Sequence, residues 1–380
     1  MVFSVKLIYV IGLPEKLRKT LGKTVKELAT RKDVYGVGIF GSWSRGEAAA
    51  SSDVDLFLLD KEDYGYDYVE RVERGGFLID LDHVPKHWIQ GPIPPEIDQK
   101  LYEMQILYDR DWALTNMKLL MAKAYCSPER VDIRTQAHVV ESDIYLSRAT
   151  SAFSRNDFRS SHLFATVALE NTLKVLVEIA SEPFSNSRFM ETAESCAAKL
   201  GMRSLFEEYV NMADYIRTDK AHAQDMPTLF KTIWNDINAV AKANLPTLES
   251  LHFKVRTRLN YYLNTAFLQG ALKRAATMIE AEKTIEATHY LSNILLNVIE
   301  NYAWLKSSID QIKIDYTTLI RSLEGLEEEN PTNCKNITAF LRLEQIDRAT
   351  AAKEINRTRE AMLKVRGDRK LLIKKSLGGD

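Results

Sequence analysis

Glycine and proline are concentrated in the first 112 residues of this 380-residue chain, and this distribution restricts the fold most strongly. Ten of the sixteen glycines and five of the ten prolines lie there, whereas residues 113–360 contain three glycines. Turns between short strands need these residues, and the interiors of long helices exclude them. The chain therefore divides near Trp112 into a turn-rich, strand-bearing part and a long helical part.

The first part begins with one amphipathic helix and continues with apolar segments of strand type. The helix at residues 14–31 has Pro14 near its first position and places apolar side chains on one face. Strand-type segments are predicted at 35–40, 55–59 and 77–85. This order predicts an α+β domain at residues 1–112.

The second part is a series of amphipathic stretches with helical spacing. They are predicted at 129–155, 157–181, 188–200, 203–218, 227–243, 247–280, 282–306, 308–324 and 333–366, with breaks near Pro183, Pro227, Pro246 and Pro331. We expect two helical bundles, 113–245 and 246–380, the second with a basic tail that starts at Lys364. A similarity between residues 162–176 and 289–304 fits two related bundles, and fits two unrelated amphipathic helices equally well.

Residues 41 to 45 have the composition of an anion-binding turn. Gly41 follows a strand-type segment and lets the backbone approach a ligand closely. If a helix covers residues 42–49, its free N–H groups and the Ser42 hydroxyl point at the ligand, and Arg45 shares that face. A triphosphate matches this set of donors.

Acidic side chains follow directly after the turn. Asp53 and Asp55 begin an apolar strand and project from the same face, where they repel unless a cation lies between them. Carboxylates of this kind suit Mg²⁺. The next strand supplies Asp80 and, two residues later, Asp82, and a buried Asp needs such a partner. We prefer Asp80 as the third carboxylate.

The pattern Gly-Ser-x-x-Arg-Gly-Glu-Ala, then Ser-Asp-x-Asp-Leu, then Asp in a strand ending in proline resembles the DNA polymerase beta-like nucleotidyltransferase superfamily. Small archaeal and bacterial members and the kanamycin nucleotidyltransferase group are the most similar. The resemblance covers residues 30–112 and implies a mixed sheet with flanking helices, closed by a strand at 106–110. It assigns phosphate binding to Gly41, Ser42 and Arg45, and metal binding and catalysis to Asp53, Asp55 and Asp80.

The activity implied by the resemblance is Mg²⁺-dependent nucleotidyl transfer. A nucleoside monophosphate moves from an NTP, with ATP favoured, to a hydroxyl acceptor, and pyrophosphate leaves. Two Mg²⁺ ions about 4 Å apart would assist the in-line attack. The acceptor is open: a small molecule, an RNA or a protein. In kanamycin-type relatives a helical domain completes the acceptor site, and by order in the chain Glu141 is the matching carboxylate.

One feature of the helical part suggests a different activity. The spacing Arg217-x4-His222 resembles the Arg-x4-6-His signature of HEPN domains, all-helical units of which some cleave RNA. Three interpretations therefore stand: an active nucleotidyltransferase, a HEPN-type ribonuclease with a regulatory nucleotidyltransferase domain, and a scaffold that binds nucleotide without turnover.

Overall composition excludes several other classes. The formal net charge of −1 gives no general attraction to nucleic acid or to anionic membranes. The three widely spaced cysteines indicate neither a disulfide framework nor a zinc cluster. The apolar stretch at 5–13 is short for a signal peptide, and no run is long enough to cross a bilayer. We expect a cytoplasmic protein without a membrane partner, and a homodimer is compatible with the sequence.

Overall fold

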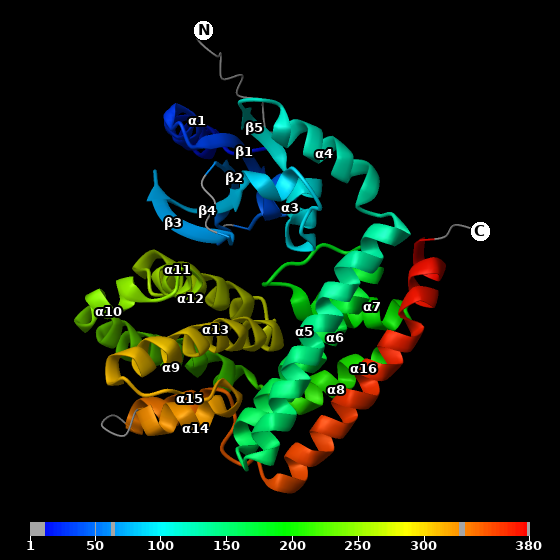
Figure 1. Ribbon diagram of the computed structural model, residues 1–380, viewed down its shortest axis with the longest axis vertical. Helices are drawn as coiled ribbons and strands as arrows, with labels where there is room; N and C mark the ends of the chain where they lie inside the picture. The colour runs from blue at the N-terminus through cyan, green and yellow to red at the C-terminus, as the bar shows by residue number, and fades with distance from the viewer. Residues whose placement is uncertain (1–11, 50, 62–64, 327–330, 378–380) are drawn as a thin grey trace. The chain divides into compact units, whose positions relative to one another are not determined.

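The computed structural model describes residues 12–49, 51–61, 65–326 and 331–377 (Figure 1). The chain forms two compact units: the first contains residues up to 125 together with 252–274, and the second contains 126–251 and the residues from 275 onward. The apolar stretch at 5–11 and the last three residues of the basic tail lie outside the described residues. The fold class is confirmed as an α+β domain followed by a large helical region.

The first unit is built on a five-stranded mixed sheet with the strand order β3-β4-β2-β1-β5. β2 and β4 run parallel, and the other neighbouring pairs are antiparallel. The strands are β1 (Val34–Phe40), β2 (Val54–Asp60), β3 (Tyr68–Arg74), β4 (Phe77–Pro85) and β5 (Gln105–Asp109). β3 was not predicted, because this edge strand carries mostly charged, partly exposed side chains instead of an apolar run.

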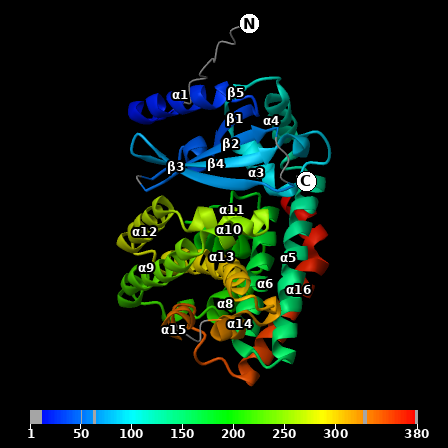
Figure 2. The same ribbon diagram turned by 60° about the vertical axis from the view of Figure 1, so that its left-hand side comes forward.

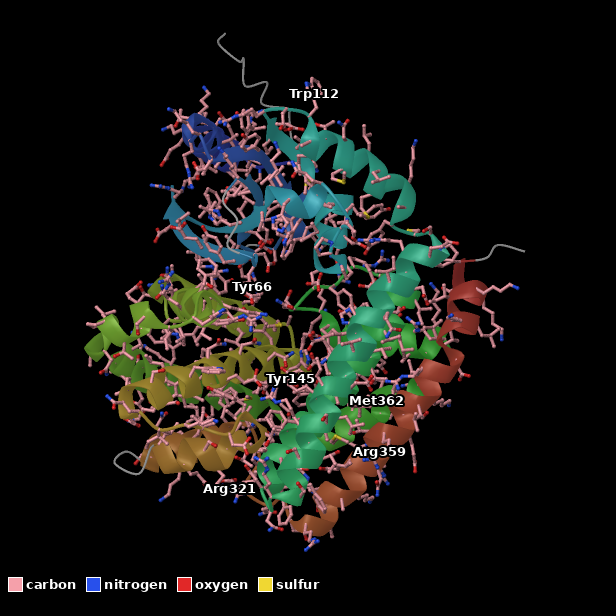
Figure 3. All side chains as sticks on the ribbon, in the orientation of Figure 1. Tyr66, Trp112, Tyr145, Arg321, Arg359 and Met362 are labelled. Carbon is pink, nitrogen blue, oxygen red and sulfur yellow. The ribbon has the colours of Figure 1, made fainter. Side chains whose placement is uncertain are left out.

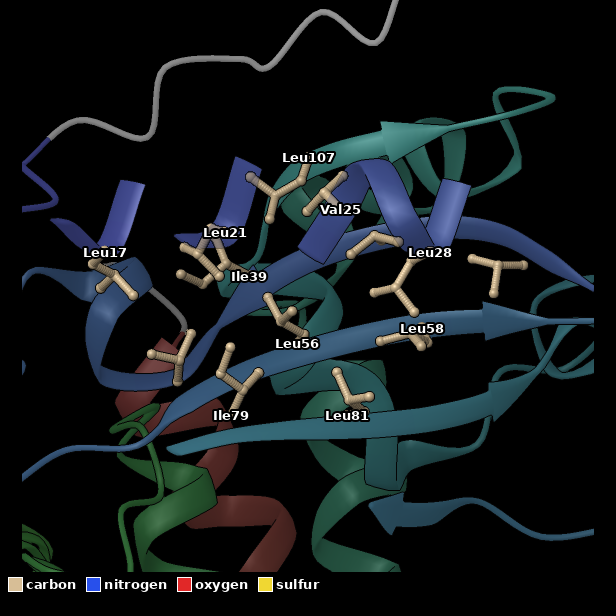
Figure 4. Packing of buried hydrophobic residues seen from close by; sticks show 13 residues of the cluster. Leu17, Leu21, Val25, Leu28, Ile39, Leu56, Leu58, Ile79, Leu81 and Leu107 are labelled. Carbon is tan, nitrogen blue, oxygen red and sulfur yellow. The ribbon is translucent and has the colours of Figure 1, made fainter. Parts of the chain in front are cut away.

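Helix α1 (Glu15–Thr30) covers one face of the sheet. Its leucines and Val25 pack against alternate residues of β1, β2 and β4, as Figure 4 shows for Leu56, Leu58 and Ile79. Side chains alternate between the two faces of a strand. The intervening positions Phe57 and Leu59 therefore belong to the core on the opposite face.

That opposite face is covered by helices from two distant parts of the chain. At the β1–β5 end lie α3 (Asp98–Glu103) and α4 (Ala113–Ala124), whose Leu101 and Leu114 are fully buried. Two short 3-10 helices, Lys86–Ile89 and Pro95–Ile97, lead from β4 to α3.

At the β3–β4 end, the same face is covered by residues 252–274. This segment contains α11 (Phe253–Tyr262) and the first part of α12 (Thr265–Glu280). α11 packs on β3, and the ring of His252 meets that of Tyr66, labelled in Figure 3, edge-on at 5.7 Å between centroids. We expected one helix over 247–280 within a second bundle of 246–380. Instead the helix is interrupted, and residues 252–274 join the first unit.

The second unit is all-helical in the residues that the structure describes. Its long helices include α5, α6, α13 and α16, and α16 packs along both α5 and α6 (Figures 1 and 2). Its helices are α5 (Pro128–Ser154), α6 (Phe158–Ile179), α7 (Phe189–Lys199), α8 (Arg203–Met212), α9 (Lys220–Ala243), α10 (Leu245–Ser250), α13 (Thr284–Asp310), α14 (Leu319–Leu326), α15 (Pro331–Phe340) and α16 (Arg348–Leu377), with 3-10 turns at Tyr215–Arg217 and Tyr316–Thr318. Pro227, expected to break a helix, lies inside α9.

Among the described helices, none is both long enough and apolar enough to cross a membrane.

Candidate active site

Two neighbouring strands of the first unit bring acidic side chains to one face of the sheet. In the parallel ladder, Asp55 on β2 lies directly opposite Asp80 on β4. Asp53 precedes β2 by one residue. Because Asp55 alternates with the α1-facing residue Leu56, these carboxylates lie on the face opposite α1. The convergence expected of Asp53, Asp55 and Asp80 is thus present in the fold.

Arg71 on β3 joins two of these carboxylates. Its guanidinium donates from Nε and Nη2 to the two oxygens of Asp80, each at 2.6 Å, and from Nη2 to Oδ2 of Asp53 at 2.5 Å. Its side chain is 3% exposed. A two-pronged contact of this type fixes the orientation of a carboxylate. Arg71 therefore holds Asp53 and Asp80 in place as one ion-paired cluster.

Residues 252–274 complete the cluster. The hydroxyl of Tyr261 donates to Oδ2 of Asp80 at 2.8 Å, and Arg274 donates to Oδ1 of Asp53. The rings of Tyr261 and Phe267 lie 5.4 and 5.1 Å from the Arg71 guanidinium. Burial and the charge of Asp80 raise the pKa of Tyr261 well above its usual value, so its hydroxyl remains a donor.

Gly270 lets α12 approach the sheet closely at Arg71. A Cβ at this position would stand 2.9 Å from Nη1 of Arg71 and 3.0 Å from a methyl group of Leu78. Glycine in a helix interior normally lowers stability. Here the close approach of α12 to Arg71 explains its presence.

Asp55 differs from its two neighbours because, among the residues that the structure describes, no cation pairs directly with its carboxylate, and Arg274 and Arg71 act on it only through their charge. Among the described residues, no side chain hydrogen-bonds to its carboxylate. Burial, and then the charges of Asp53 and Asp80, raise the pKa of Asp55 well above its ordinary value. By contrast, Arg274 and Arg71 overcome the effect of burial and lower the pKa of Asp53. The uncompensated charge of the cluster is thus concentrated at Asp55.

The glycine–serine turn lies against this carboxylate. Gly41 has a φ of +72°, and a Cβ there would collide with the carboxylate of Asp55. Only glycine meets both conditions without strain. The hydroxyl of Ser42, in the same turn, makes no hydrogen bond with the residues that the structure describes. Ser42 is thus available to a ligand beside Asp55.

The anion-binding donors expected at Gly41 and Arg45 are already occupied. Glu103, at the end of α3, accepts from the Gly41 amide at 2.8 Å and pairs with Arg45 at 2.5 Å. Arg45 also pairs with Glu47. The helix expected at 42–49 is only α2 (Gly41–Arg45), ended by Gly46 at φ +76°. Arg45 therefore links the turn to α3 through its ion pair with Glu103.

Asp82 lies two residues after Asp80 on the same face but in a separate ion pair. Lys100 of α3 donates to its carboxylate, and Asp67 lies 3.7 Å from the Lys100 ammonium. Burial raises the pKa of Asp82. The structure thus separates Asp82 from the cluster of Asp53, Asp55 and Asp80.

The chemistry of the cluster suits a divalent cation. Mg²⁺ prefers carboxylate oxygens, and Asp55 is a carboxyl crowded by two others and lacking a counter-ion. Both oxygens of Asp53, however, accept from arginine. Within the described ranges, no three His, Cys, Asp or Glu side chains are arranged around a common ion position. The three carboxylates are therefore of the type that binds Mg²⁺. In this structure, arginine side chains neutralise two of them, Asp53 and Asp80.

The candidates in the second unit do not form a comparable site. Glu141 is exposed on α5. Arg217, with 81% of its side chain exposed, pairs with Asp214 at 3.4 Å and lines a cavity of about 490 Å³. His222 does not line that cavity; its Nε2 is buried without a hydrogen bond, and burial lowers its pKa. No hydrogen bond or ion pair joins Arg217 to His222 in the part of the chain that the structure describes.

Four contributors to the site were missed by sequence reasoning: Arg71, Glu103, Tyr261 and Arg274. Arg71 belongs to β3, which was not predicted because its charged residues obscure the alternation of apolar and polar side chains. Glu103 precedes the predicted strand at 106–110, and no sequence pattern indicates that it pairs with Arg45. Tyr261 and Arg274 lie in an ordinary amphipathic stretch, so no local pattern distinguishes them.

Comparison with known proteins shows that the part of the chain that carries the acidic strands matches a family of domains. Residues 21–112 match the nucleotidyltransferase domain family. A solved nucleotidyltransferase-like protein from Exiguobacterium sibiricum aligns with 85% of this chain and 90% of its own, at 11% identity and a TM-score of 0.32. No curated protein matches. The family match includes the acidic strands and the glycine–serine turn and ends before residues 252–274.

Proposed function

Because residues 21–112 belong to the nucleotidyltransferase domain family, we propose that this enzyme moves a nucleoside monophosphate from an NTP to a hydroxyl acceptor and releases pyrophosphate. One observation carries the proposal. Asp55 presents a carboxyl without a counter-ion, directly opposite Asp80 and against the Gly41–Ser42 turn. The charge of a cation and the phosphates of a nucleotide complement these groups.

Asp53, Asp55 and Asp80 would hold two Mg²⁺ ions in this proposal. When bound, such ions polarise the α-phosphate and offset the charge that develops on the attacking and leaving oxygens. Ser42 would donate to the triphosphate from the turn beside Asp55. ATP is the donor that we test first, and the acceptor remains a hydroxyl of unspecified origin.

Asp80 is the residue that we propose as proton acceptor for the attacking hydroxyl. Burial outweighs the contact with Arg71 and raises the pKa of Asp80, which makes it a better base than an exposed carboxylate. Arg71 and Tyr261 fix its orientation through three hydrogen bonds. The proton would therefore pass to a base that cannot rotate away.

The test is pyrophosphate release with Mg²⁺ and each of the four NTPs across a panel of hydroxyl acceptors. Asp55→Asn and Asp53→Asn should abolish release, as should removal of divalent ions by a chelator. Glu73→Gln, at an exposed position of β3, is the matched control and should be neutral. Release that persists in Asp55→Asn would overturn the proposal.

A scaffold that binds nucleotide without turnover is the second candidate, and one observation favours it. Both oxygens of Asp53 are occupied by guanidinium groups, which is a stable arrangement without metal. The same assay separates the two functions. Binding of a nucleotide without pyrophosphate release under any acceptor would support the scaffold.

A further inference from the structure

Two neighbouring helices of the second unit leave apolar side chains uncovered. α16 packs along α5, and the two helices lie side by side in Figures 1 and 2. Five of their apolar side chains are between 46% and 57% exposed: Ile133, Val140 and Ile144 on α5, and Leu363 and Leu371 on α16. We call the outer surface that carries these five residues the α5–α16 face. Exposed apolar side chains that gather on one surface mark a site of protein–protein contact.

Two ion pairs define how α5 and α16 are aligned. Arg366 of α16 pairs with Asp143 of α5 at 2.5 Å, and Arg369 pairs with Asp132 at 3.1 Å. Because the residue number rises along α16 while it falls along α5, the helices run antiparallel. With a rise of about 1.5 Å per residue, three pairs of residues lie within about one helical turn of the same height: Leu363 and Ile144, Gly367 and Val140, and Leu371 and Ile133.

The interior of α16 contains a glycine that no contact within the described chain explains. Gly367 lies midway between Leu363 and Leu371, four residues from each, so the three share one face of the helix. Glycine in a helix interior lowers stability relative to alanine. A Cβ added to Gly367 would meet no described atom within 4 Å. The missing side chain leaves space on the outside of α16 for a second helix.

A second copy of the chain fits the α5–α16 face by two-fold symmetry. A two-fold axis in the plane of the face, parallel to both helices, keeps every residue at its height and sets α5 of one copy across α16 of the other. Val140 of one copy then faces the space above Gly367 of the other. The apolar side chains on either side of this contact meet one another, so all five become buried twice over in one interface.

The charges of the two helices are complementary. The charged residues at exposed positions of α5 are acidic, whereas those of α16 are basic apart from Glu360. Glu141 of α5 and Lys364 of α16 lie at about the same height, and neither forms an ion pair with the residues that the structure describes. In the two-fold arrangement, Glu141 of each copy meets Lys364 of the other. Opposite charges at such positions set the register of an interface.

The size of the α5–α16 face matches that of a stable dimer interface. α5 has 27 residues and α16 has 30. Each helix is about 40 Å long and about 10 Å across, so the face offers about 800 Å² per copy. Specific protein–protein interfaces bury about this area on each partner.

We propose that this protein forms a two-fold homodimer in which α5 of each copy packs across α16 of the other. The contact between Val140 and Gly367 lies at its centre, and the pair Glu141–Lys364 lies at its edge. The interface belongs to the second unit and uses none of the residues of the candidate active site.

Reversing one charge of the edge pair tests the arrangement directly. Glu141→Lys and Lys364→Glu each place like charges opposite each other twice per dimer, and each should raise the dimer dissociation constant about tenfold. An equimolar mixture of the two variants pairs opposite charges at both positions, so it should form heterodimers about as tightly as the wild type forms homodimers. Sedimentation equilibrium of the full chain measures all three, and Lys26→Glu, at an exposed position of α1, is the neutral control.

Two variants test the apolar centre. Val140→Glu places a charge against Gly367 and should raise the dissociation constant about 100-fold or more. Gly367→Ala fills the space that Val140 needs and should weaken the dimer about tenfold, although alanine strengthens the helix itself. Leu119→Glu replaces an equally exposed leucine of α4 and should change nothing. Circular dichroism verifies that every variant folds, since all of these positions lie on the surface.

A wild-type dimer that each single charge reversal weakens and that the mixture restores supports the proposal. A wild-type chain that stays monomeric throughout the micromolar range would overturn it. So would a dimer that is indifferent to Val140→Glu, because another surface would then hold the copies together. A monomer that binds single-stranded RNA or anionic vesicles through Lys364 would assign the face to that partner, and this too would overturn the proposal.

Discussion

Asp55 and Asp80 stand directly opposite each other in the parallel ladder of β2 and β4, on a buried part of the sheet. Two carboxylates in register at such a place repel each other unless a cation or a proton intervenes. Arg71 supplies the cation for Asp80 but not for Asp55. The ionised form of Asp55 is therefore electrostatically unfavourable in the folded protein, and its effect on stability can be measured.

Asp55→Asn should stabilise the metal-free protein while it abolishes transfer. Because burial and two neighbouring carboxylates raise the pKa of Asp55 in the folded state, its ionisation opposes folding at neutral pH. We expect the free energy of unfolding at pH 7 to increase by about 1 kcal/mol. The gain should vanish towards pH 4, where the group is protonated. Urea denaturation at both pH values measures it, and a less stable variant at pH 7 would contradict this explanation.

His83 should make the stability of the first unit fall in alkaline solution. Burial disfavours its charged form, but Asp60 at 2.5 Å and Glu70 raise the pKa of His83 to about 9. A raised pKa in a histidine stabilises the fold fully below its unfolded value of 6.5, and this contribution disappears as the pH rises through 9. We expect a loss of about 3 kcal/mol over that range.

His83→Asn, whose amide nitrogen stands near the position of the Nδ1 atom that contacts Asp60, is the variant that isolates this effect. It removes the titrating group and keeps a hydrogen-bond donor for Asp60, so its unfolding free energy should depend less on pH between 6.5 and 9. Urea denaturation at pH 6, 7.5 and 9 provides the comparison. Parallel curves for wild type and variant would assign the alkaline loss to other groups.

Arg45 and Glu103 should behave as one structural unit. Either truncation to Ala leaves a largely buried charged partner and should lower the free energy of unfolding by about 3 kcal/mol. The double variant should lose much less than the sum, with a coupling of about 1–3 kcal/mol in a double-mutant cycle. Additive losses would indicate that Arg45 acts elsewhere, for example on phosphate.

Gly270→Ala should impair transfer more than it impairs folding. A methyl group at 2.9 Å from Nη1 of Arg71 must displace either α12 or the guanidinium that holds Asp53 and Asp80. We expect kcat to fall about tenfold or more, since small displacements of catalytic groups are costly. Gly325→Ala on α14 is the control, because a methyl group there would meet no atom within 4 Å. It should leave kcat unchanged and raise stability by about 0.5–1 kcal/mol.

The sequence identified the sheet well wherever a strand is apolar. The predicted segment 77–85 coincides with β4, and 35–40 differs from β1 by one residue, because continuous buried runs leave little choice. β3 was not predicted because a partly exposed edge strand can carry charged residues at alternate positions. Arg71 was missed for the same reason, since its role depends on its register with Asp80.

The part of the site that sequence reasoning could not reach depends on contacts between distant residues. The motif predicts that Arg45 contacts a phosphate, but in the structure its guanidinium pairs with Glu103, 58 residues later in the chain. Arg274 reaches Asp53 across 221 positions. A local motif reports which residue types lie near one another, and only the fold reports which of them have already been paired.

The placement of residues 252–274 in the first unit has a consequence for protein synthesis. A ribosome releases β3 and β4 long before α11, and it completes residues 126–251 in the interval. Until the later helices emerge, Arg71 lacks Tyr261 and Asn264, and this end of the sheet has no cover. We therefore expect the nascent amino-terminal region to stay sensitive to proteases until residue 274 has left the exit tunnel, so that the enzyme acquires its reactive centre late in translation.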